Sequence, residues 1–506
     1  MSNWKLLSGV AAASIMTAAI VAPAEAQVTT SEIRGSVSSD SGAVVSDASV
    51  SITDTATGLT RSTTTSATGA YAIRNLPISS SYQVTVSATG LQSQQVDNVP
   101  LVLGDTTNLD FTLTADADRT LDTIVVTASA TDLIQTAVGP SATFGLETLQ
   151  NAPTINRNIT DVLRIDPRIY VDESRGDINP IQCGGKNPRF NSLTLDGVRL
   201  NDGFGLNSNG YPTERQPFPF DAIEQVAVEL SPFDVEYGGF TACNINAVTK
   251  SGTNEFHGSA FFDYASDDFQ GDSLEGSSIQ ANPFDEYRYG AQIAGPIVKD
   301  TLFFSVAYEK LEGANTFDRG PFGSGAINVA IVTQEDLDEI SRIARDIYGF
   351  DPGGIPTSFD NEDEKILVKL DWNINNQHRA AFTYNYNDGF NITQSDGDLD
   401  EFEFSNHLYE RGAELNQYVG FLYSDWTDNF STEVRLGYVD LENRQNSVGG
   451  TDFGEITIET DDVNVYIGGD DSRQSNELNY SILNMAFKGF YQLNDHAITF
   501  GYEREE

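Results

Sequence analysis

The 506-residue chain has few cysteines, histidines and basic residues, and each scarcity excludes a class of protein. Two cysteines cannot form a disulfide-rich scaffold, and four histidines leave little for a metalloenzyme. The 29 Lys and Arg residues stand against 74 Asp and Glu residues, which gives a net charge of −45. This charge excludes a nucleic-acid binder, because phosphates would repel the chain and no basic stripe offsets the repulsion.

The first 26 residues have the features of an export signal. Lys5 supplies a positive charge, residues 6–22 are mostly apolar, and the A-x-A sequence that ends at Ala26 predicts cleavage before Gln27. An N-terminal membrane anchor is the alternative, but the apolar run is short for a spanning helix. No later segment has ~18 consecutive apolar residues, so we expect no transmembrane helix in the mature protein.

Residues 30–114 contain seven short runs in which apolar residues alternate with Ser and Thr, and this pattern predicts a small β-sandwich. The stretches "GAVVSDASVSITDTATG" and "TTTSATGAYAIRNLP" resemble the carboxypeptidase regulatory-like domain, a transthyretin-like sandwich. The resemblance implies an architecture shared with carbohydrate-binding modules. Tyr71 and Tyr82 are the candidate platforms for glycan stacking, and a periplasmic spacer or docking domain is the simpler interpretation.

The segment 115–134 is a polar linker that contains one short β-branched run. Such a run, without partner strands nearby, can add itself to the sheet edge of another protein. It resembles the TonB box of the outer-membrane TonB-dependent receptors, and an ordinary buried strand is the alternative. The matching residues are Asp122, Thr123, Ile124, Val125, Val126, Thr127 and Ala128.

Residues 135–255 mix helix and strand signals. Ile159–Ile165 has apolar residues at helical spacing, and Asp196-Gly197 predicts a hairpin turn. The ordered stretches "VLRIDPRI", "LDGVRL" and "IEQVAVELSPFDVEYGG" resemble the plug domain of the TonB-dependent receptors, and their wording is close to the Oar-like subfamily. Cys183 and Cys243 lie in this segment, and an even pair in an exported protein predicts a disulfide.

Residues 256–506 show a sustained two-residue alternation, in which Ile366, Val368 and Leu370 alternate with Lys369 and Asp371. One apolar face and one charged face are typical of a strand between lipid and lumen, and a soluble jelly roll is the alternative. Tight turns alternate with long connections at about 313–362, 388–412 and 441–477, as in outer-membrane barrels. Residues 257–506 carry 15 basic and 47 acidic residues, a charge of 15 − 47 = −32, which we assign to extracellular loops and lumen.

The sequence predicts a mainly β protein with a sandwich, an α+β plug and an antiparallel transmembrane β-barrel. About nine barrel strands are expected, whereas the resembled family uses about twenty-two, so we expect a barrel that is incomplete at its C-terminal end. The strands lie near 256–264, 286–298, 301–312, 364–374, 378–387, 413–426, 429–440, 479–492 and 496–504. The predicted domains are 1–26 (signal peptide), 30–114 (regulatory-like sandwich), 115–134 (linker), 135–255 (plug) and 256–506 (partial barrel).

No catalytic constellation is found in the sequence, so we expect neither an enzyme nor a bound cofactor. His407 and Glu410 have the H-x-x-E spacing of metallocarboxypeptidases, but without a recognisable third ligand we interpret this as a chance match. Asp396, Asp398 and Asp400 are weak candidates for a divalent cation. Their segment lacks the glycine and glutamate of a calcium loop, so a solvated acidic loop is the simpler interpretation.

The resemblance implies a receptor in the bacterial outer membrane that takes up a scarce ligand, namely an iron–siderophore, a carbohydrate or an oligopeptide. TonB, from the inner-membrane TonB–ExbB–ExbD complex, would bind the box and remodel the plug. The expected partners are the C-terminal domain of TonB, outer-membrane lipid and a small extracellular ligand, with no nucleic acid. The alternative is a surface adhesion or structural protein whose N-terminal domain binds glycans.

Overall fold

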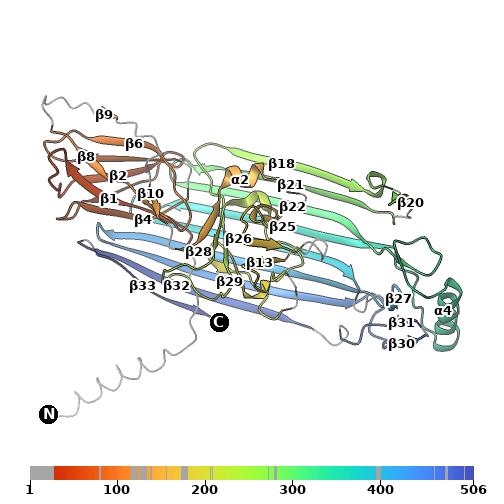
Figure 1. The fold of residues 1–506 in the computed structure, drawn as a ribbon. Coiled ribbons are helices and arrows are strands. Elements are labelled where there is room, and N and C mark those ends of the chain that lie inside the picture. The colour runs from red at the N-terminus through yellow and green to blue at the C-terminus, as the bar shows by residue number, and fades with distance from the viewer. Residues whose placement is uncertain are drawn as a thin grey trace, which may run out of the picture.

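The computed structural model describes residues 28–506 apart from 79–80, 116–123, 126–133, 137–138, 155, 173–179, 206, 208, 272, 279–281, 395–399, 461, 473–476 and 495. A small sandwich lies at one end of a large sheet of long strands, and a folded cap lies at the other end (Figure 1). The predicted signal peptide and its cleavage site at Ala26 and Gln27 lie outside the described residues. Within the described chain, no helix is both long enough and apolar enough to cross a membrane.

The sandwich is built from eight short strands and two strands of the following segment. They are β1 (Ser31–Ser39), β2 (Ser49–Asp54), β3 (Thr60–Thr64), β4 (Ala70–Leu76), β5 (Tyr82–Ser87), β6 (Gln94–Val99), β7 (Thr106–Asn108), β8 (Phe111–Leu113), β9 (Ile124–Val125) and β10 (Ile134–Thr136). One sheet has the order β3-β2-β5-β6-β9, and the other has the order β10-β7-β1-β4 with β8 beside β1. Apolar side chains of both sheets meet between them, and Ile33, Ile52 and Val84 are fully buried.

Tyr71 and Tyr82, the candidate glycan platforms, both lie in this core with 3% and 0% of their surface exposed. The Tyr71 hydroxyl donates to the Leu109 carbonyl at 2.6 Å, and the Tyr82 hydroxyl donates to the Pro77 carbonyl at 2.7 Å. A ring can stack on a sugar only if one of its faces is exposed. The prediction that these two residues are stacking platforms is therefore wrong.

The plug is a second, separate unit around a five-stranded sheet with the order β11-β16-β17-β14-β15. Its elements are β11 (Ser141–Phe144), α2 (Leu146–Asn151), α3 (Ile159–Leu163), β12 (Ile169–Val171), β13 (Ile181–Cys183), η3 (Pro188–Phe190), β14 (Ser192–Leu195), β15 (Val198–Arg199), η4 (Phe220–Ala222), β16 (Ile223–Glu229) and β17 (Asn244–Thr249). The helix α3 is two residues shorter than predicted. Asn158 caps its start by accepting a hydrogen bond from the Thr160 amide, and the chain leaves the helix ahead of Pro167, since a residue before proline disfavours helical geometry.

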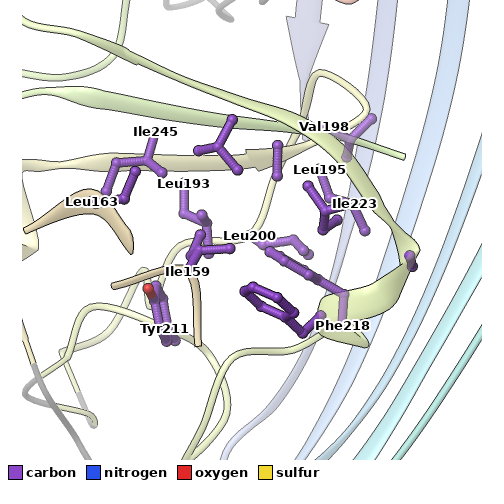
Figure 2. Packing of buried hydrophobic residues seen from close by; sticks show 14 of the residues in the cluster. Ile159, Leu163, Leu193, Leu195, Val198, Leu200, Tyr211, Phe218, Ile223 and Ile245 are labelled. Atoms are coloured by element: carbon purple, nitrogen blue, oxygen red, sulfur yellow. The ribbon is translucent and has the colours of Figure 1, made fainter. Parts of the chain in front are cut away.

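Apolar side chains from α3 and from the plug sheet form one continuous core (Figure 2). Ile159, Leu195 and Phe218 are fully buried in it. The same cluster includes side chains of the large sheet, among them Leu367 and Leu415. The plug is therefore packed against one face of that sheet.

The large sheet has nine long strands in the described chain, and each neighbouring pair is antiparallel. In spatial order they are β18 (His257–Ser266), β21 (Asp285–Val298), β22 (Leu302–Thr316), β25 (Ser358–Asn373), β26 (His378–Thr393), β28 (Tyr409–Thr427), β29 (Phe430–Ser447), β32 (Asn479–Leu493) and β33 (His496–Glu505). The fold class and the sequential strand order are those predicted. Several strands run past their predicted ends, and β26 and β28 take up much of the predicted connection 388–412.

The two faces of this sheet differ in chemistry. On β25, Lys365, Lys369 and Asp371 lie on the buried face that meets the plug, whereas Leu370 and Trp372 lie on the exposed face. The exposed aromatic and aliphatic side chains continue onto the neighbouring strands, and they include Phe382, Tyr418, Leu422, Trp426, Leu436, Tyr438, Phe487, Tyr491, Phe500 and Tyr502. A soluble sandwich buries its apolar face, so this inverted arrangement fits a sheet that faces lipid on its outside.

The connections at the two ends of the sheet differ in length. Next to the sandwich, β21 and β22, β25 and β26, and β28 and β29 are joined by 299–301, 374–377 and 428–429. At the other end lie the connections 317–357, 394–408 and 448–478. In outer-membrane barrels the short turns face the periplasm, so the sandwich lies on the periplasmic side.

We call the described residues of 317–357, 394–408 and 448–478 the cap. The long connections predicted here contain regular structure that was not predicted from the sequence, namely α4 (Gln334–Tyr348) and a small sheet of β27 (Glu401–Glu403), β31 (Asn464–Ile467) and β30 (Ile456–Glu459). The cap also has its own apolar core, with Leu337, Phe402 and Val465 buried. The three connections therefore fold together as one unit at the end opposite the sandwich (Figure 1).

Candidate functional site

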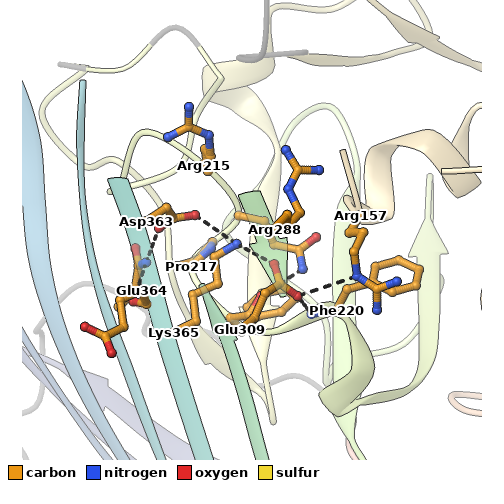
Figure 3. A network of polar contacts seen from close by, with 12 residues as sticks. Arg157, Arg215, Pro217, Phe220, Arg288, Glu309, Asp363, Glu364 and Lys365 are labelled. Carbon is orange, nitrogen blue, oxygen red and sulfur yellow. Dashed lines mark hydrogen bonds and ion pairs between the residues drawn. The ribbon is translucent and has the colours of Figure 1, made fainter. Parts of the chain in front are cut away.

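The candidate site is the polar contact surface between the plug and the inner face of the large sheet. At its centre the Lys365 ammonium lies 3.1 Å from Glu309 and 3.0 Å from Asp363, with all three side chains at most 6% exposed (Figure 3). Glu309 also accepts a hydrogen bond from the backbone amide of Phe220 in the plug at 3.1 Å. Buried charges persist only where they are paired and hydrogen-bonded, so this network ties η4 to β22 and β25.

Arg157 of the plug extends the network towards the first strands of the sheet. Its guanidinium donates to Asp221 at 2.6 Å and lies 4.0 Å from Glu309 (Figure 3). The same group stacks on Phe261 of β18, 3.5 Å from the ring centre. A planar guanidinium can pair with carboxylates through its edge and with an aromatic ring through its face, which lysine cannot do.

The hairpin turn predicted from Asp196-Gly197 has a second role. Both residues have positive φ angles, 46° and 72°, as a tight β14–β15 turn requires. The Asp196 carboxylate accepts hydrogen bonds from the Thr249 amide and hydroxyl at 2.9 and 2.7 Å, and from the Thr383 hydroxyl of β26 at 2.8 Å. Lys369 of β25 donates to the Thr249 carbonyl at 2.9 Å. The Asp196 side chain thus fastens the turn to the inner face of the large sheet.

Nearer the cap, Glu214 of the plug pairs with Arg411 at the start of β28. Two guanidinium nitrogens lie 2.6 and 2.7 Å from the two carboxylate oxygens, and Asn391 of β26 donates to the same carboxylate at 3.1 Å. Glu214 is 4% exposed. This ion pair fastens the outer part of the plug to β28.

Cys183 and Cys243 are joined by a disulfide across a sequence separation of 60. Cys183 ends β13, and Cys243 immediately precedes β17. The bond lies in the plug core beside Asn191, whose amide group donates to the Ile181 carbonyl at 2.9 Å. A crosslink of this span restricts the unfolded plug, and in the chain-entropy model it contributes about 4 kcal/mol.

On the periplasmic side the sandwich is docked onto the short turns and the plug. Arg61 of β3 forms an ion pair with Asp425 of β28, and the Thr64 hydroxyl donates to Asp428 at 2.8 Å. Gln225 of β16 accepts from the Leu103 amide at 3.1 Å and donates to the Leu101 carbonyl at 3.3 Å. The sandwich therefore lies on the periplasmic side of the plug and of the large sheet, and it contacts both.

Two carboxylates face each other in this junction. Burial raises the pKa of Glu229 in the plug, the nearby charge of Asp105 of the sandwich adds to the rise and a hydrogen bond from Tyr237 opposes it, and the resulting pKa is about 7. Burial also raises the pKa of Asp105. Glu229 is 3% exposed. A proton bound by Glu229 removes the repulsion between the two carboxylates, so we expect this junction to be more stable at low pH.

The predicted TonB box lies only partly within the described residues. Ile124 and Val125 form β9, which pairs in parallel with Gln94 and Gln95 of β6. Strand β9 is the outermost strand of its sheet, and it ends the order β3-β2-β5-β6-β9 (Figure 1). The other five residues of the box, Asp122, Thr123, Val126, Thr127 and Ala128, lie outside the described residues.

The weak cation candidates are only partly visible as well. Asp396 and Asp398 lie outside the described residues. Asp400 is exposed and immediately precedes β27, and its carbonyl accepts a hydrogen bond from the Asn464 amide at 2.8 Å.

The contacts between the plug and the large sheet were not predicted residue by residue. Their only sequence signal was the charged side of the alternating strands, which does not reveal which plug residue meets which strand.

Three family models match successive parts of the chain. They are described as a carboxypeptidase regulatory-like domain (residues 32–114), a TonB-dependent receptor plug domain (134–242) and an outer-membrane beta-barrel domain (248–318). A plug packed inside an apolar-faced antiparallel sheet is the architecture of an outer-membrane receptor. The three matched domains are those of a TonB-dependent receptor of the bacterial outer membrane, with a regulatory-like domain in front of the plug.

Among its curated relatives are the TonB-dependent transporter Oar of Myxococcus xanthus and the probable TonB-dependent siderophore receptor PirA of Acinetobacter baumannii. Oar is 26% identical over 223 residues, which are 42% of this chain and 20% of Oar. PirA is 29% identical over 231 residues, which are 43% of this chain and 28% of PirA. The chain thus matches well under a third of each relative.

Solved structures with a similar arrangement include the outer-membrane transporter YddB of Escherichia coli and the siderophore receptor PirA of A. baumannii. YddB has a TM-score of 0.49 and 13% identity, and the match covers 70% of this chain and 45% of YddB. PirA has a TM-score of 0.46 and 18% identity, with 72% of this chain and 47% of PirA covered.

The boundaries between domains, at 114, 134 and 255, stay predictions.

Proposed function

We propose that the protein takes up a scarce extracellular ligand across the outer membrane and that TonB supplies the energy by binding the segment Asp122–Ala128. The observation that carries this proposal is the pairing of β9 with β6 on the periplasmic side. This segment already pairs with one sheet edge, so its backbone groups can form the hydrogen bonds that pairing with a strand of TonB would require. The protein acts as a transporter and performs no covalent chemistry.

In this proposal TonB exchanges one strand partner for another. Within the described part of the linker, two residue pairs, Gln94 with Ile124 and Gln95 with Val125, hold β9 on the sandwich. Each backbone hydrogen bond contributes about 1 kcal/mol net, so this pairing is weak enough to be replaced by a longer one. A pull on the box then acts first on the sandwich and next on the plug, because the linker joins the two.

Opening a path requires release of some of the contacts between plug and wall. The buried pairs of Glu309 with Lys365 and Glu214 with Arg411 are costly to separate in a dry interior. Near the turn, the Asp196 carboxylate is held by neutral donors, Thr249 and Thr383. The one of these bonds that reaches the large sheet, from Thr383, involves a single charge and contributes about 1.5–3 kcal/mol, whereas breaking a buried ion pair costs about 3–5 kcal/mol. We therefore expect the part of the plug around Asp196 to move before the part around Glu309.

The first test replaces Ile124 with Pro in the receptor expressed in its outer membrane. Proline removes a backbone donor and restricts the chain, so binding of TonB and energy-dependent accumulation of ligand should be lost. Ile124→Val is the matched control, because it keeps the donor and the β-branched shape. Unchanged accumulation by Ile124→Pro would refute the proposal.

A second test locks β9 in place. Gln94→Cys with Ile124→Cys puts two thiols at paired positions, and their oxidation should block capture of the receptor by the C-terminal domain of TonB. Reduction should restore capture. The unsubstituted receptor, treated with the same reductant, controls for the native Cys183–Cys243 bond. Equal capture in the oxidised and reduced states would show that β9 need not leave β6.

The relatives of this chain indicate which ligands to assay first. PirA is named a siderophore receptor, so ferric siderophores are the first ligands to assay, followed by carbohydrates and oligopeptides. The measurement is uptake of labelled ligand by cells with and without an energised inner membrane. For the alternative function, glycan adhesion, the burial of Tyr71 and Tyr82 removes the two proposed platforms, and glycan binding by the whole receptor without uptake would favour it.

A further inference from the structure

The cap contains a cluster of metal-ligating side chains from two separate connections. His407 follows β27, while Glu455 and Asp470 flank the β30–β31 hairpin on either side. One potential ligand atom from each of the three lies within 4.8 Å of the others. We call these three residues the cap cluster. It is distinct from the predicted candidates Asp396, Asp398 and Asp400.

The imidazole of His407 is oriented for ligation. The side chain is fully buried, and its Nδ1 lies 2.9 Å from the Gly468 carbonyl, to which it donates. This hydrogen bond assigns the proton to Nδ1 and makes Nε2 the ring nitrogen that would bind a metal. A histidine that binds a metal through one ring nitrogen usually donates from the other to a carbonyl or a carboxylate, which fixes both its tautomer and its angle.

A further carboxylate lies on the same side of the ring. Glu403, 1% exposed, has its Oε1 3.7 Å from His407 Nε2. In a tetrahedral zinc site with bonds of about 2.0–2.1 Å, neighbouring ligand atoms are roughly 3.4 Å apart. The separations in the cap cluster therefore close to ligand distances with side-chain movements of about 1 Å.

The two cluster carboxylates are held in place by backbone amides. Glu455 Oε2 accepts a hydrogen bond from the Asp471 amide at 3.1 Å, and Asp470 Oδ1 accepts one from the Ser472 amide at 3.0 Å. Asp470 is only 2% exposed. Such bonds orient ligating carboxylates in metal sites and limit the entropy that binding costs.

We propose that the cap cluster binds one divalent first-row transition ion of the Zn²⁺ type, with His407, Glu455 and Asp470 as its protein ligands. Imidazole nitrogen with carboxylate oxygens suits Zn²⁺ and its neighbours, whereas Ca²⁺ takes oxygen ligands alone. Three protein ligands leave the fourth tetrahedral position for a water molecule. The ion is a resident part of the cap and is independent of the transported ligand.

The site has a structural consequence for the cap. The ion would crosslink 394–408, which carries His407, to 448–478, which carries Glu455 and Asp470. These connections are also joined by the parallel pairing of β27 with β31. Because the third connection packs on the same apolar core, the ion would stabilise the whole cap.

The test measures zinc binding to the detergent-purified receptor after chelator treatment and reloading with Zn²⁺ alone. We expect one ion per chain that is lost in His407→Gln, and a dissociation constant raised about tenfold or more in Glu455→Gln. Glu459→Gln and His496→Gln are the matched controls, since Glu459 and His496 are exposed and outside the cluster. Both should bind zinc as the unsubstituted receptor does.

Stability provides a second measurement that does not depend on how a variant folds. Removal of zinc from the unsubstituted receptor should make the cap more sensitive to protease, and reloading should reverse the change. Absence of stoichiometric zinc, or equal binding by the unsubstituted receptor and His407→Gln, would overturn the proposal and leave a buried ion pair of His407 with Glu403. Binding of Ca²⁺ in preference to Zn²⁺ would also overturn it.

Discussion

The sandwich and the large sheet use the same alternating β pattern in opposite senses. In the sandwich, Ile52 and Val84 point inward and are fully buried. In the large sheet, Leu436 and Trp372 point outward with 55% and 48% of their surface exposed, and Lys365 is buried inside. The period of two determines that each is a strand, but the surroundings determine which face is apolar.

The sandwich and the large sheet are held together by different kinds of contact. The sandwich is held by apolar contact between two sheets, which needs no specific partner. The inner wall of the large sheet carries charges that need defined partners on the plug, such as Glu309 for Lys365. The first kind of interior fixes no particular pairing, whereas the second fixes which plug residue meets which strand.

The largest effect is expected from Ile52→Asp in the sandwich. An unpaired carboxylate would be buried between the two sheets, and the domain should lose more than about 4 kcal/mol of stability. Protease sensitivity of residues 30–114 in the whole receptor measures the loss. Ser51→Asp, one residue away on the opposite face, is the control and should change little. Equal sensitivity of both variants would contradict the inward apolar face.

Lys365→Met comes next, because it removes the cation shared by Glu309 and Asp363. Two buried carboxylates would face each other, at a cost of about 3–5 kcal/mol. Urea unfolding followed in the barrel region measures it. A second substitution, Glu309→Gln, should recover part of the loss by removing one charge. No recovery would mean that the network does not act as a unit.

Leu436→Arg tests the outer face. In a bilayer an arginine near the midplane costs about 2–4 kcal/mol, whereas Glu442→Arg on the same face, nearer the cap, should cost about 0–1 kcal/mol. Folding into vesicles at increasing urea concentrations compares the two variants. If Leu436→Arg is neutral, the outer face does not contact lipid.

The smallest effect concerns the junction between sandwich and plug. The pKa of Glu229 is raised to about 7 in the folded protein from 4.5, so its contribution to stability is complete below pH 4.5 and is lost as the pH rises to about 7. Glu229→Gln should be more stable than the unsubstituted receptor above pH 7, by on the order of 2 kcal/mol, and equal to it near pH 4. Thermal unfolding from pH 4 to pH 8 checks this. Parallel pH profiles of the two proteins would contradict it.

Much of the fold could be predicted because the sandwich and the large sheet have clear two-residue periods. The cap could not, although Thr333 and Asp336 form a capping box at the start of α4 and Leu337 begins its apolar face. That signal is short and lies within a long acidic connection. The strand ends were also missed, since Asn361 and Glu362 are both polar and show no change of face in sequence.

The site could be predicted only in outline. The charged inner face was evident, but Lys365 and Glu309 are 56 residues apart in sequence, and their pairing depends on the register of β22 with β25. Asp196 was identified only as a turn residue, because no pattern in its surroundings points to Thr383 on a distant strand. Such contacts follow from the packing of whole elements and have no local signal.

The central claim is that the large sheet faces lipid on its outer side, and Trp372 and Trp426 test it directly. Both are exposed on that side, close to the short turns. In vesicles, lipids brominated near the headgroup should quench their fluorescence more than lipids brominated near the chain ends, because tryptophan lies at the membrane interface. Replacing both with Phe should remove the quenched signal. Fluorescence from these two residues that no brominated lipid quenches would contradict the account.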